Sequence, residues 1–432
     1  MISTKNKNFT SNIQKLYISI SVCFIVWPFS FGLFYSQIFG LLMLFVLFLF
    51  NIKLLLKTSI PKRDAPILLI LLALISITLF SYLNWEGSFF SFFFYIYKFI
   101  IFYFVSLFLI IIIKNNDKNE YYPELILFKS IYIYLFFIIL QFSIPDFHIW
   151  SFKNFGTEAA FEVIEKNMSG HNLRNLGWNG FLFASDGVAF SFSALFILFY
   201  RTSIKNLSTK HKLFLFFIEI ICIALALISG RSTIPIVLIY FIFYAFSSGF
   251  LSLFLKIFAL IVISLLLFIA YGDTILNHPF FVWLLEPITS SISHGKLYSN
   301  STDVTNNVYM EFFSGPSACN FLDNFNCYYY KSNNDYYANG LVGADSGFIR
   351  LYYAIGLHGF IIFILMWCYF VFKISITCLK RKSLYFFLVL IFLIYSLAFF
   401  YKSEWLYQNF FIFYFFVLYN SIFLNSSKKT DK

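Results

Sequence analysis

Apolar runs about as long as a bilayer is thick recur along the whole chain. A helix that spans the hydrocarbon core of a membrane needs about 20 mostly apolar residues. About twelve segments of the 432-residue sequence meet or approach that length: 16–34, 37–56, 66–84, 89–113, 125–145, 181–200, 212–229, 233–248, 250–271, 347–372, 384–401 and 405–424. Only 12% of the residues are charged, whereas soluble domains carry about 25%. We therefore expect an all-α, polytopic integral membrane protein, in which residues 1–432 form a single transmembrane domain.

The distribution of Lys and Arg predicts the orientation of these spans. Cytoplasmic connections of membrane proteins carry an excess of basic residues. With the N-terminus in the cytoplasm, most of the 31 Lys and Arg lie on the cytoplasmic side, as does the C-terminus. The two longest hydrophilic stretches, 146–180 and 272–346, are then external loops. The net charge of +11 reflects this topology and contact with anionic lipids, so nucleic acid is not an expected partner.

The larger external loop is rich in Tyr, Asn, Ser and Asp, as in the stretch CYYYKSNNDYYANG. Aromatic faces pack on sugar C–H groups, and amides and carboxylates bond sugar hydroxyls, so this composition suits sugar binding. A merely solvated loop is the alternative interpretation. Cys319 and Cys327 lie close together in this loop. Because an external compartment is oxidising, the pair predicts a disulfide.

Arg231 stands in the stretch ALISGRSTIPIVL, where a polar turn separates two apolar runs. An arginine at membrane depth is costly without a partner, so it marks a functional hypothesis. Arg174 and Arg350 lie at the external ends of two other predicted spans. Because guanidinium groups pair with phosphate in a bidentate manner, we interpret the three as one cluster that binds a lipid-linked phosphate or pyrophosphate. The alternative is three separate side chains that reach to the headgroups.

Other polar residues near the predicted spans are further candidates. His171 precedes the sixth span, Asp186 lies just within it, and Asp345 ends the large external loop. Glu219 and Lys98 lie within two spans, and we expect them to pair, because an unpaired buried charge is strongly destabilising. A proton relay is the alternative. The sequence has neither the HExxH zinc motif nor a GxxxxGK[ST] phosphate loop, so we expect no metal and no cofactor.

Three of these stretches resemble the O-antigen polymerase and ligase superfamily of bacterial inner-membrane proteins. SGRST at 229–233 is similar to a short Ser-x-Arg turn of that superfamily between two spans. LRNLGWNGFLFASDGVAFSF is similar to its Arg-x-x-Gly stretch that leads into a span. DSGFIRLYYAIGLHGFIIF is similar to the segment that closes its large external loop.

The resemblance implies a metal-independent glycosyltransferase at the outer face of the bacterial inner membrane. Its substrate would be an oligosaccharide repeat unit on undecaprenyl pyrophosphate, its partners the membrane lipids and a chain-length regulator. Arg231, Arg350 and Arg174 would stabilise the departing pyrophosphate. Asp345 is the first choice for the base that takes the proton of the acceptor hydroxyl, with two further candidates: His171 and Asp186.

One departure from the superfamily pattern bears on the choice among its members. Ligases of the superfamily are expected to carry a histidine near the end of the large loop, where this chain has Asp345 and Ser346. We therefore favour a polymerase of O-antigen or capsule repeat units. His171-Asn172 in the other loop keeps a ligase as the alternative. A lipid-linked oligosaccharide flippase is the alternative from another functional class.

Overall fold

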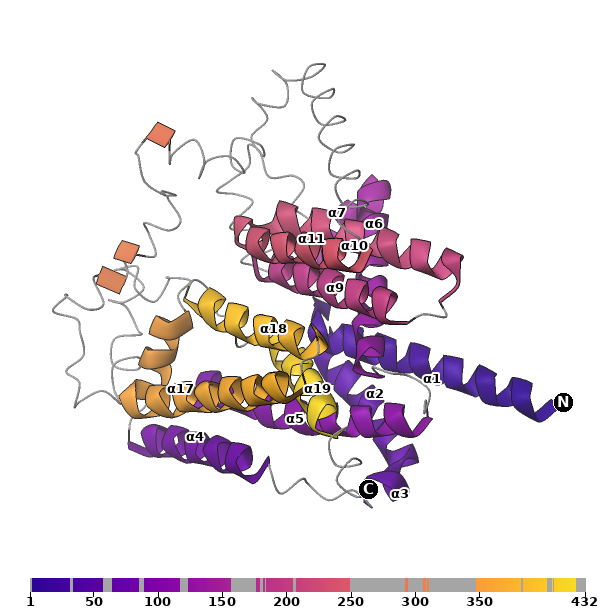
Figure 1. Cartoon of the computed structure of the whole chain (residues 1–432). Coiled ribbons are helices and arrows are strands. Elements are labelled where there is room, and N and C mark those ends of the chain that lie inside the picture. The colour runs from indigo at the N-terminus through magenta and orange to yellow at the C-terminus, as the bar shows by residue number, and fades with distance from the viewer. Residues whose placement is uncertain are drawn as a thin grey trace. The chain divides into compact units, whose positions relative to one another are not determined.

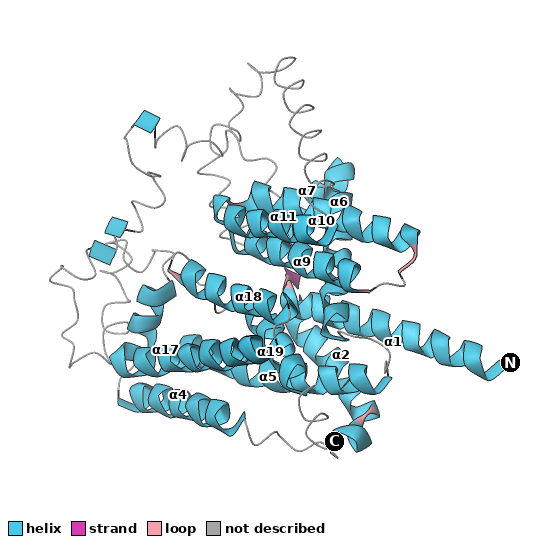
Figure 2. Cartoon of the chain, viewed as in Figure 1, coloured by secondary structure: helices cyan, strands magenta, loops and turns pink. Residues whose placement is uncertain are grey.

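The computed structural model of the chain describes most of the predicted spans (Figure 1). The described residues are 2–31, 34–56, 64–84, 89–116, 123–156, 176–178, 182, 184–204, 207–248, 292–293, 306–307, 309–310, 347–381, 384–401, 406 and 408–424. Almost all of them are helical, and Figure 2 shows the helices with one pair of short strands. The helical fold expected from the sequence is thus confirmed.

Most of the described helices coincide with apolar segments of the sequence, whereas one helix, α7 (Pro145–Phe155), lies almost entirely in the stretch 146–180, which the sequence predicts as an external loop. They are α1 (Ile2–Val26), β1 (Ser30–Phe31), β2 (Phe34–Tyr35), α2 (Ser36–Phe50), α3 (Ile52–Leu55), α4 (Ala65–Asn84), α5 (Phe89–Asn116), η2 (Pro123–Ser130), α6 (Ile131–Ser143), α7 (Pro145–Phe155), α9 (Ala184–Ser203), α10 (Thr209–Ser229), η4 (Arg231–Thr233), α11 (Ile234–Ser248), α17 (Gly347–Arg381), α18 (Leu384–Phe400) and α19 (Asn409–Leu424). The η elements are 3₁₀ helices.

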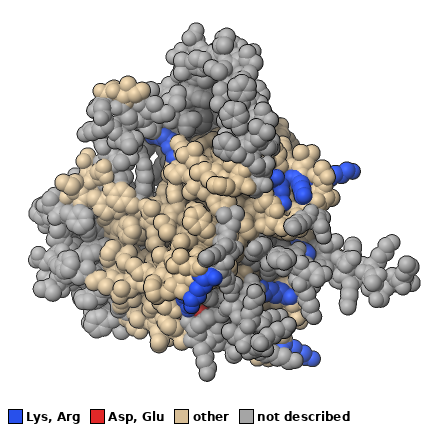
Figure 3. Space-filling view, in the orientation of Figure 1, with Lys and Arg blue, Asp and Glu red and all other residues tan. Residues whose placement is uncertain are grey.

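Three helical stretches in the described part of the chain are long and apolar enough to cross a membrane: Tyr97–Asn115, Thr209–Ser229 and Gly359–Lys380. Shorter apolar helices cover other predicted spans. Figure 3 shows that the described residues on one face are mainly uncharged, with Lys and Arg at a few separate places. These features fit a membrane protein, while the number of about twelve spans stays a prediction.

The first predicted span, 16–34, differs from the structure. Helix α1 already ends at Val26, and strands β1 and β2 follow as an antiparallel pair, with Ser30 opposite Tyr35. Pro28 explains the early end, because proline lacks the backbone N–H that a continuing helix needs. The predicted span 250–271 and most of the large loop lie outside the described residues.

The chain divides into two compact units. Unit 1 comprises Met1–Val46 and Asn119–Ser299, and unit 2 comprises Leu47–Lys118 and Asn300–Lys432. Helix α9 forms the centre of unit 1: it packs against α10, α11, η2 and η4, and every residue from Gly187 to Tyr200 is buried. The single transmembrane domain expected from the sequence stays a prediction.

Unit 2 is built around the helix pair α5 and α19, with α17 packed against α4 and α18. Aromatic rings fill its core: the ring of Trp367 lies 5.0 Å from that of Phe415 and 5.4 Å from that of Phe411. Helix α19 is buried from Asn409 to Ile422. The abundant phenylalanine of the sequence therefore serves helix packing here, besides facing outward.

Candidate functional site

The structure describes only part of the site predicted from the sequence. Asp186 lies in the first turn of α9 and Arg231 opens η4, both in unit 1 and both half-buried. Arg350 lies in α17 of unit 2, and its side chain is outside the described set. The other predicted site residues lie outside the described residues: Arg174, His171, Asp345, Cys319 and Cys327.

The backbone at Arg231 lies directly against the first turn of α9. A Cβ atom at Gly187, the residue after Asp186, would lie 2.7 Å from Cγ2 of Thr233 and 2.9 Å from Cβ of Ser229. A Cβ atom at Gly230 would lie 3.1 Å from Cβ of Ala184. A side chain at Gly187 would force its neighbours to shift, and one at Gly230 would be tightly packed, so the two glycines allow the segments that contain Asp186 and Arg231 to lie close together.

Hydroxyl groups of the SGRST stretch bond to backbone carbonyl oxygens at the end of α10. The hydroxyl of Ser229 donates to the carbonyl oxygen of Leu225 at 2.6 Å. The hydroxyl of Thr233 donates to the carbonyl oxygens of Gly230 at 2.7 Å and Ala226 at 3.1 Å. Two of these carbonyl oxygens also accept backbone N–H groups: that of Ala226 from Gly230 and that of Gly230 from Thr233, each at 3.2 Å. The turn therefore holds Arg231 at the start of the helical segment that continues as α11.

This arrangement places a cation and a carboxylate at the same end of unit 1. Arg231 is the first residue of η4, which continues as α11, and the N-terminal end of a helix favours an anion. The carboxylate of Asp186 can accept a proton from a hydroxyl group. The two side chains together suit a ligand that has both an anionic group and a reacting hydroxyl.

The end of the first predicted external loop is fixed to the helices by Gln141. The side-chain oxygen of Gln141 accepts a hydrogen bond from the backbone N–H of Gly177 at 2.7 Å, and its amide donates to the Gly177 carbonyl oxygen at 3.2 Å. The same amide donates to the hydroxyl of Ser151 in α7 at 2.7 Å. A single glutamine in an apolar segment belongs to no motif, so nothing in the sequence indicated this role for Gln141.

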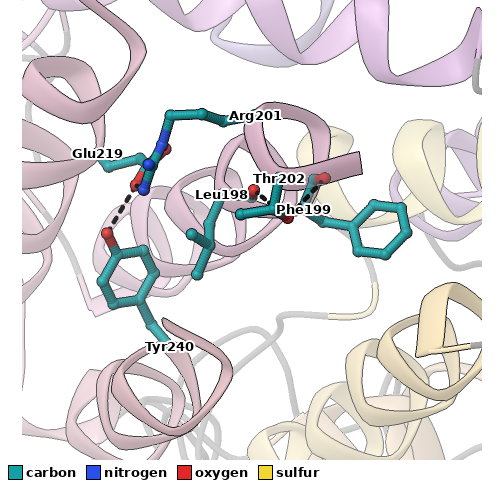
Figure 4. A network of polar contacts seen from close by, with 6 residues as sticks. All are labelled: Leu198, Phe199, Arg201, Thr202, Glu219 and Tyr240. Carbon is teal, nitrogen blue, oxygen red and sulfur yellow. Dashed lines mark hydrogen bonds and ion pairs between the residues drawn. The ribbon is translucent and has the colours of Figure 1, made fainter. Parts of the chain in front are cut away.

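Glu219 forms a different contact from the one predicted. Both of its oxygens accept hydrogen bonds from Arg201, at 2.7 and 2.9 Å, and Tyr240 donates a further bond at 2.7 Å (Figure 4). Glu219 is fully buried, and its partners come from the neighbouring helices α9 and α11. The predicted pairing with Lys98 is therefore wrong: Arg201, which follows a predicted span, reaches the carboxylate instead.

A second buried carboxylate lies in unit 2. Asp64, directly before α4, accepts hydrogen bonds from the hydroxyls of Tyr103 and Tyr419, each at 2.9 Å. Lys373 donates to the hydroxyl of Tyr419 at 3.0 Å and to that of Tyr369 at 2.8 Å. The hydroxyl of Tyr419 thus bridges a cation and an anion. Neither Asp64 nor Lys373 stood out in the sequence, where both belong to basic cytoplasmic connections.

The described residues contain no group of three or more His, Cys, Asp or Glu side chains that could hold a metal ion. Independence from metals and cofactors stays a prediction. No known protein family, curated protein or solved structure matches this chain.

Proposed function

We propose that the protein is a membrane glycosyltransferase that polymerises oligosaccharide repeat units carried on undecaprenyl pyrophosphate. One observation supports the proposal: the turn that contains Arg231 packs against the first turn of α9, which contains Asp186. The apolar helices support a membrane location, and the resemblance of the SGRST stretch to the O-antigen polymerase and ligase superfamily supports the reaction class. We further propose about twelve spans, both termini in the cytoplasm, and the bacterial inner membrane as location.

The proposed reaction transfers a glycan from one undecaprenyl pyrophosphate carrier to a sugar hydroxyl of a second lipid-linked repeat unit. The acceptor hydroxyl oxygen forms a bond to the anomeric carbon of the donor glycan, and the bond from that carbon to the pyrophosphate oxygen breaks. The electron pair of the broken bond remains on undecaprenyl pyrophosphate, and a carboxylate takes the hydroxyl proton. The glycosyl–pyrophosphate bond itself supplies the driving force, so no nucleotide sugar is required.

Arg231 has the clearest role in this reaction. Negative charge develops on the leaving pyrophosphate, and a cation already in place stabilises it at little cost in reorganisation. Three residues are candidates for the base. Asp186 lies in the part of the chain that the structure describes, whereas Asp345 and His171 lie outside it. Arg174 and Arg350 remain proposed partners of Arg231 at the pyrophosphate.

The test is a deletion of the gene in the producing bacterium, followed by complementation with variants. With Arg231→Ala we expect glycans of a single repeat unit and normal amounts of protein. Arg231→Lys keeps the charge but loses the bidentate geometry, so we expect partial activity. Lys153→Ala is the matched control, because Lys153 is an exposed cation of α7 in the same unit. Full-length polymer with Arg231→Ala contradicts the role of Arg231.

The same deletion separates the alternatives. Loss of a polymerase leaves single repeat units on the final acceptor. Loss of a ligase leaves finished polymer on the lipid carrier, and loss of a flippase leaves repeat units on the cytoplasmic side. Either of the last two results replaces the proposed polymerase with the corresponding activity.

A further inference from the structure

Tyr134 lies where three parts of unit 1 meet. It belongs to α6, and its ring stacks on that of Phe190 in α9, with centroids 5.8 Å apart and 10° between the planes. Phe190 is one helical turn beyond Asp186, and residues four apart share one face of a helix. Tyr134, which is buried, therefore packs against the face of α9 that carries Asp186.

The hydroxyl of Tyr134 contacts the segment that precedes α9. The ring of Tyr134 lies against that of Trp178, with centroids 5.7 Å apart, and its hydroxyl lies against the backbone of Gly177. A Cβ atom at Gly177 would lie only 2.6 Å from the hydroxyl oxygen. Gly177 has a φ of +92°, a left-handed conformation that favours glycine. The Tyr134 hydroxyl thus packs against a left-handed backbone conformation at Gly177, which glycine adopts more easily than other residues do.

Gln141 holds the same segment from a second direction. Its amide pairs with both backbone groups of Gly177, and it is buried together with Ser151. The ring of Trp178 stacks on that of Phe137, with centroids 4.9 Å apart. Buried polar groups whose hydrogen bonds are satisfied make a region rigid. The segment 176–178, eight residues before Asp186, is therefore held firmly by its contacts.

We propose that Tyr134 is a positioning residue for Asp186: it fixes the Gly177–Trp178 backbone to the Asp186 face of α9, and so holds the carboxylate in place. This inference rests on the proposed function, in which Asp186 accepts the proton of the acceptor hydroxyl. Tyr134 contacts protein rather than substrate, so it acts through Asp186. Its effect should appear in turnover and not in substrate binding.

The first test replaces Tyr134 by Phe in the full-length protein reconstituted in liposomes with a synthetic undecaprenyl-pyrophosphate-linked repeat unit. The substitution removes one oxygen and keeps the ring stack. We expect kcat to fall about ten- to a hundredfold with KM little changed, since small misplacements of catalytic groups have effects of this size. The matched control is Tyr132→Phe in the same helix, whose buried hydroxyl has no hydrogen-bond partner in the described structure and whose ring lies against Phe214. Unchanged kcat with Tyr134→Phe overturns the inference.

A double-mutant cycle tests whether Tyr134 acts through Asp186. If it does, Tyr134→Phe causes little further loss in the Asp186→Asn background, because groups that act as a unit are not additive. Fully additive losses contradict the inference. Full activity of Asp186→Asn alone removes Asp186 from the proposed mechanism instead.

A third measurement decides the structural part of the inference whatever reaction the chain catalyses. In an Asp186→Cys variant, the rate of labelling by a membrane-impermeant maleimide is followed at the peptide that contains residue 186, by mass spectrometry. Adding Tyr134→Phe should raise this rate severalfold, and adding Tyr132→Phe should leave it unchanged. Equal rates with and without the Tyr134 hydroxyl overturn the inference, whereas absence of glycan transfer by the intact protein overturns only the proposed function.

Discussion

In unit 1 the buried carboxylate of Glu219 is held directly by the guanidinium group of Arg201, whereas in unit 2 that of Asp64 is held by two tyrosine hydroxyls. The unit 1 contact joins helices that follow one another in the chain. The unit 2 contact joins residue 64 to Tyr419, 355 positions later. Lys373 reaches Asp64 through the hydroxyl of Tyr419.

This difference shows two ways of keeping a carboxylate inside an apolar helix bundle. A direct bidentate pair compensates the charge strongly, but removal of either partner leaves the other uncompensated. A hydrogen bond from a neutral hydroxyl to a charged group contributes about 1.5–3 kcal/mol, less than the loss expected when one partner of a buried ion pair is removed. We therefore expect the Arg201–Glu219 pair to contribute most to the stability of unit 1, and the Tyr419 hydroxyl, which connects early and late segments of the chain, to contribute less to that of unit 2.

The largest effect is expected for Glu219→Ala. Arg201 would then lie against the rings of Phe216 and Tyr244 without its carboxylate partner, because its side chain is only 15% exposed. We expect the free energy of unfolding, measured by titration with sodium dodecyl sulfate in mixed micelles, to fall by about 3–5 kcal/mol. The double variant with both Glu219→Met and Arg201→Met should recover most of this loss, since it leaves no charge. A double variant as unstable as Glu219→Ala contradicts the direct pair.

A smaller loss is expected for Tyr419→Phe in unit 2. The substitution removes the hydroxyl that donates to Asp64 and accepts from Lys373. Hydrogen bonds to charged groups contribute about 1.5–3 kcal/mol, so we expect a loss in that range in the same titration. Asp64 keeps its bond from Tyr103, which limits the effect. Stability equal to that of the unmodified protein would show that the bridge does not hold unit 2 together.

Tyr240→Phe is the matched substitution in unit 1 and should cost less. Tyr240 donates to an oxygen of Glu219 that Arg201 also bonds, so the carboxylate stays paired after the change. We expect a loss of about 1 kcal/mol, similar to other hydrogen bonds between membrane helices. If Tyr240→Phe lowers the free energy of unfolding more than Tyr419→Phe does, the expected order of the two units is wrong.

The smallest effect is expected for Lys129→Met. Lys129 donates to the hydroxyl of Tyr200 at 3.2 Å and lies 4.7 Å from the centroid of its ring. Tyr200 directly precedes Arg201 in the sequence. A cation–π contact of this kind contributes about 0.5–1 kcal/mol where it is accessible to solvent. If Lys129→Met lowers the free energy of unfolding as much as Glu219→Ala does, Lys129 contributes to stability in more ways than this contact with Tyr200.

Sequence patterns predicted the helices well because length and apolarity alone decide them. The predicted spans 66–84 and 384–401 differ from α4 and α18 by a single residue at one end. Helix α1 ends at Val26, eight residues before the predicted span does, because Pro28 follows. The predicted span 125–145 begins as the 3₁₀ helix η2 and becomes α-helical only from Ile131. Span 347–372 is extended to Arg381 in α17, because charged residues near a helix end do not stop the helix.

The partners of individual side chains could not be predicted in the same way. Arg201 reaches Glu219 because α9 and α10 are antiparallel neighbours and an arginine side chain spans more than one helical turn. Gly187 and Gly230 are two ordinary glycines in the sequence, yet their close contacts place Arg231 beside the Asp186 end of α9. Such contacts depend on how helices pack, which the apolar pattern of each helix leaves open.

Glycan transfer by the purified protein is the most direct test of the site at Arg231 and Asp186. The protein is placed in liposomes with a synthetic undecaprenyl-pyrophosphate-linked repeat unit and no nucleotide sugar, and products are separated by length. We predict longer glycans, one undecaprenyl pyrophosphate released for each new bond, loss of both products with Arg231→Ala, and no change with Lys153→Ala. Failure of the intact protein to lengthen the glycan, or equal lengthening by Arg231→Ala, would contradict this assignment.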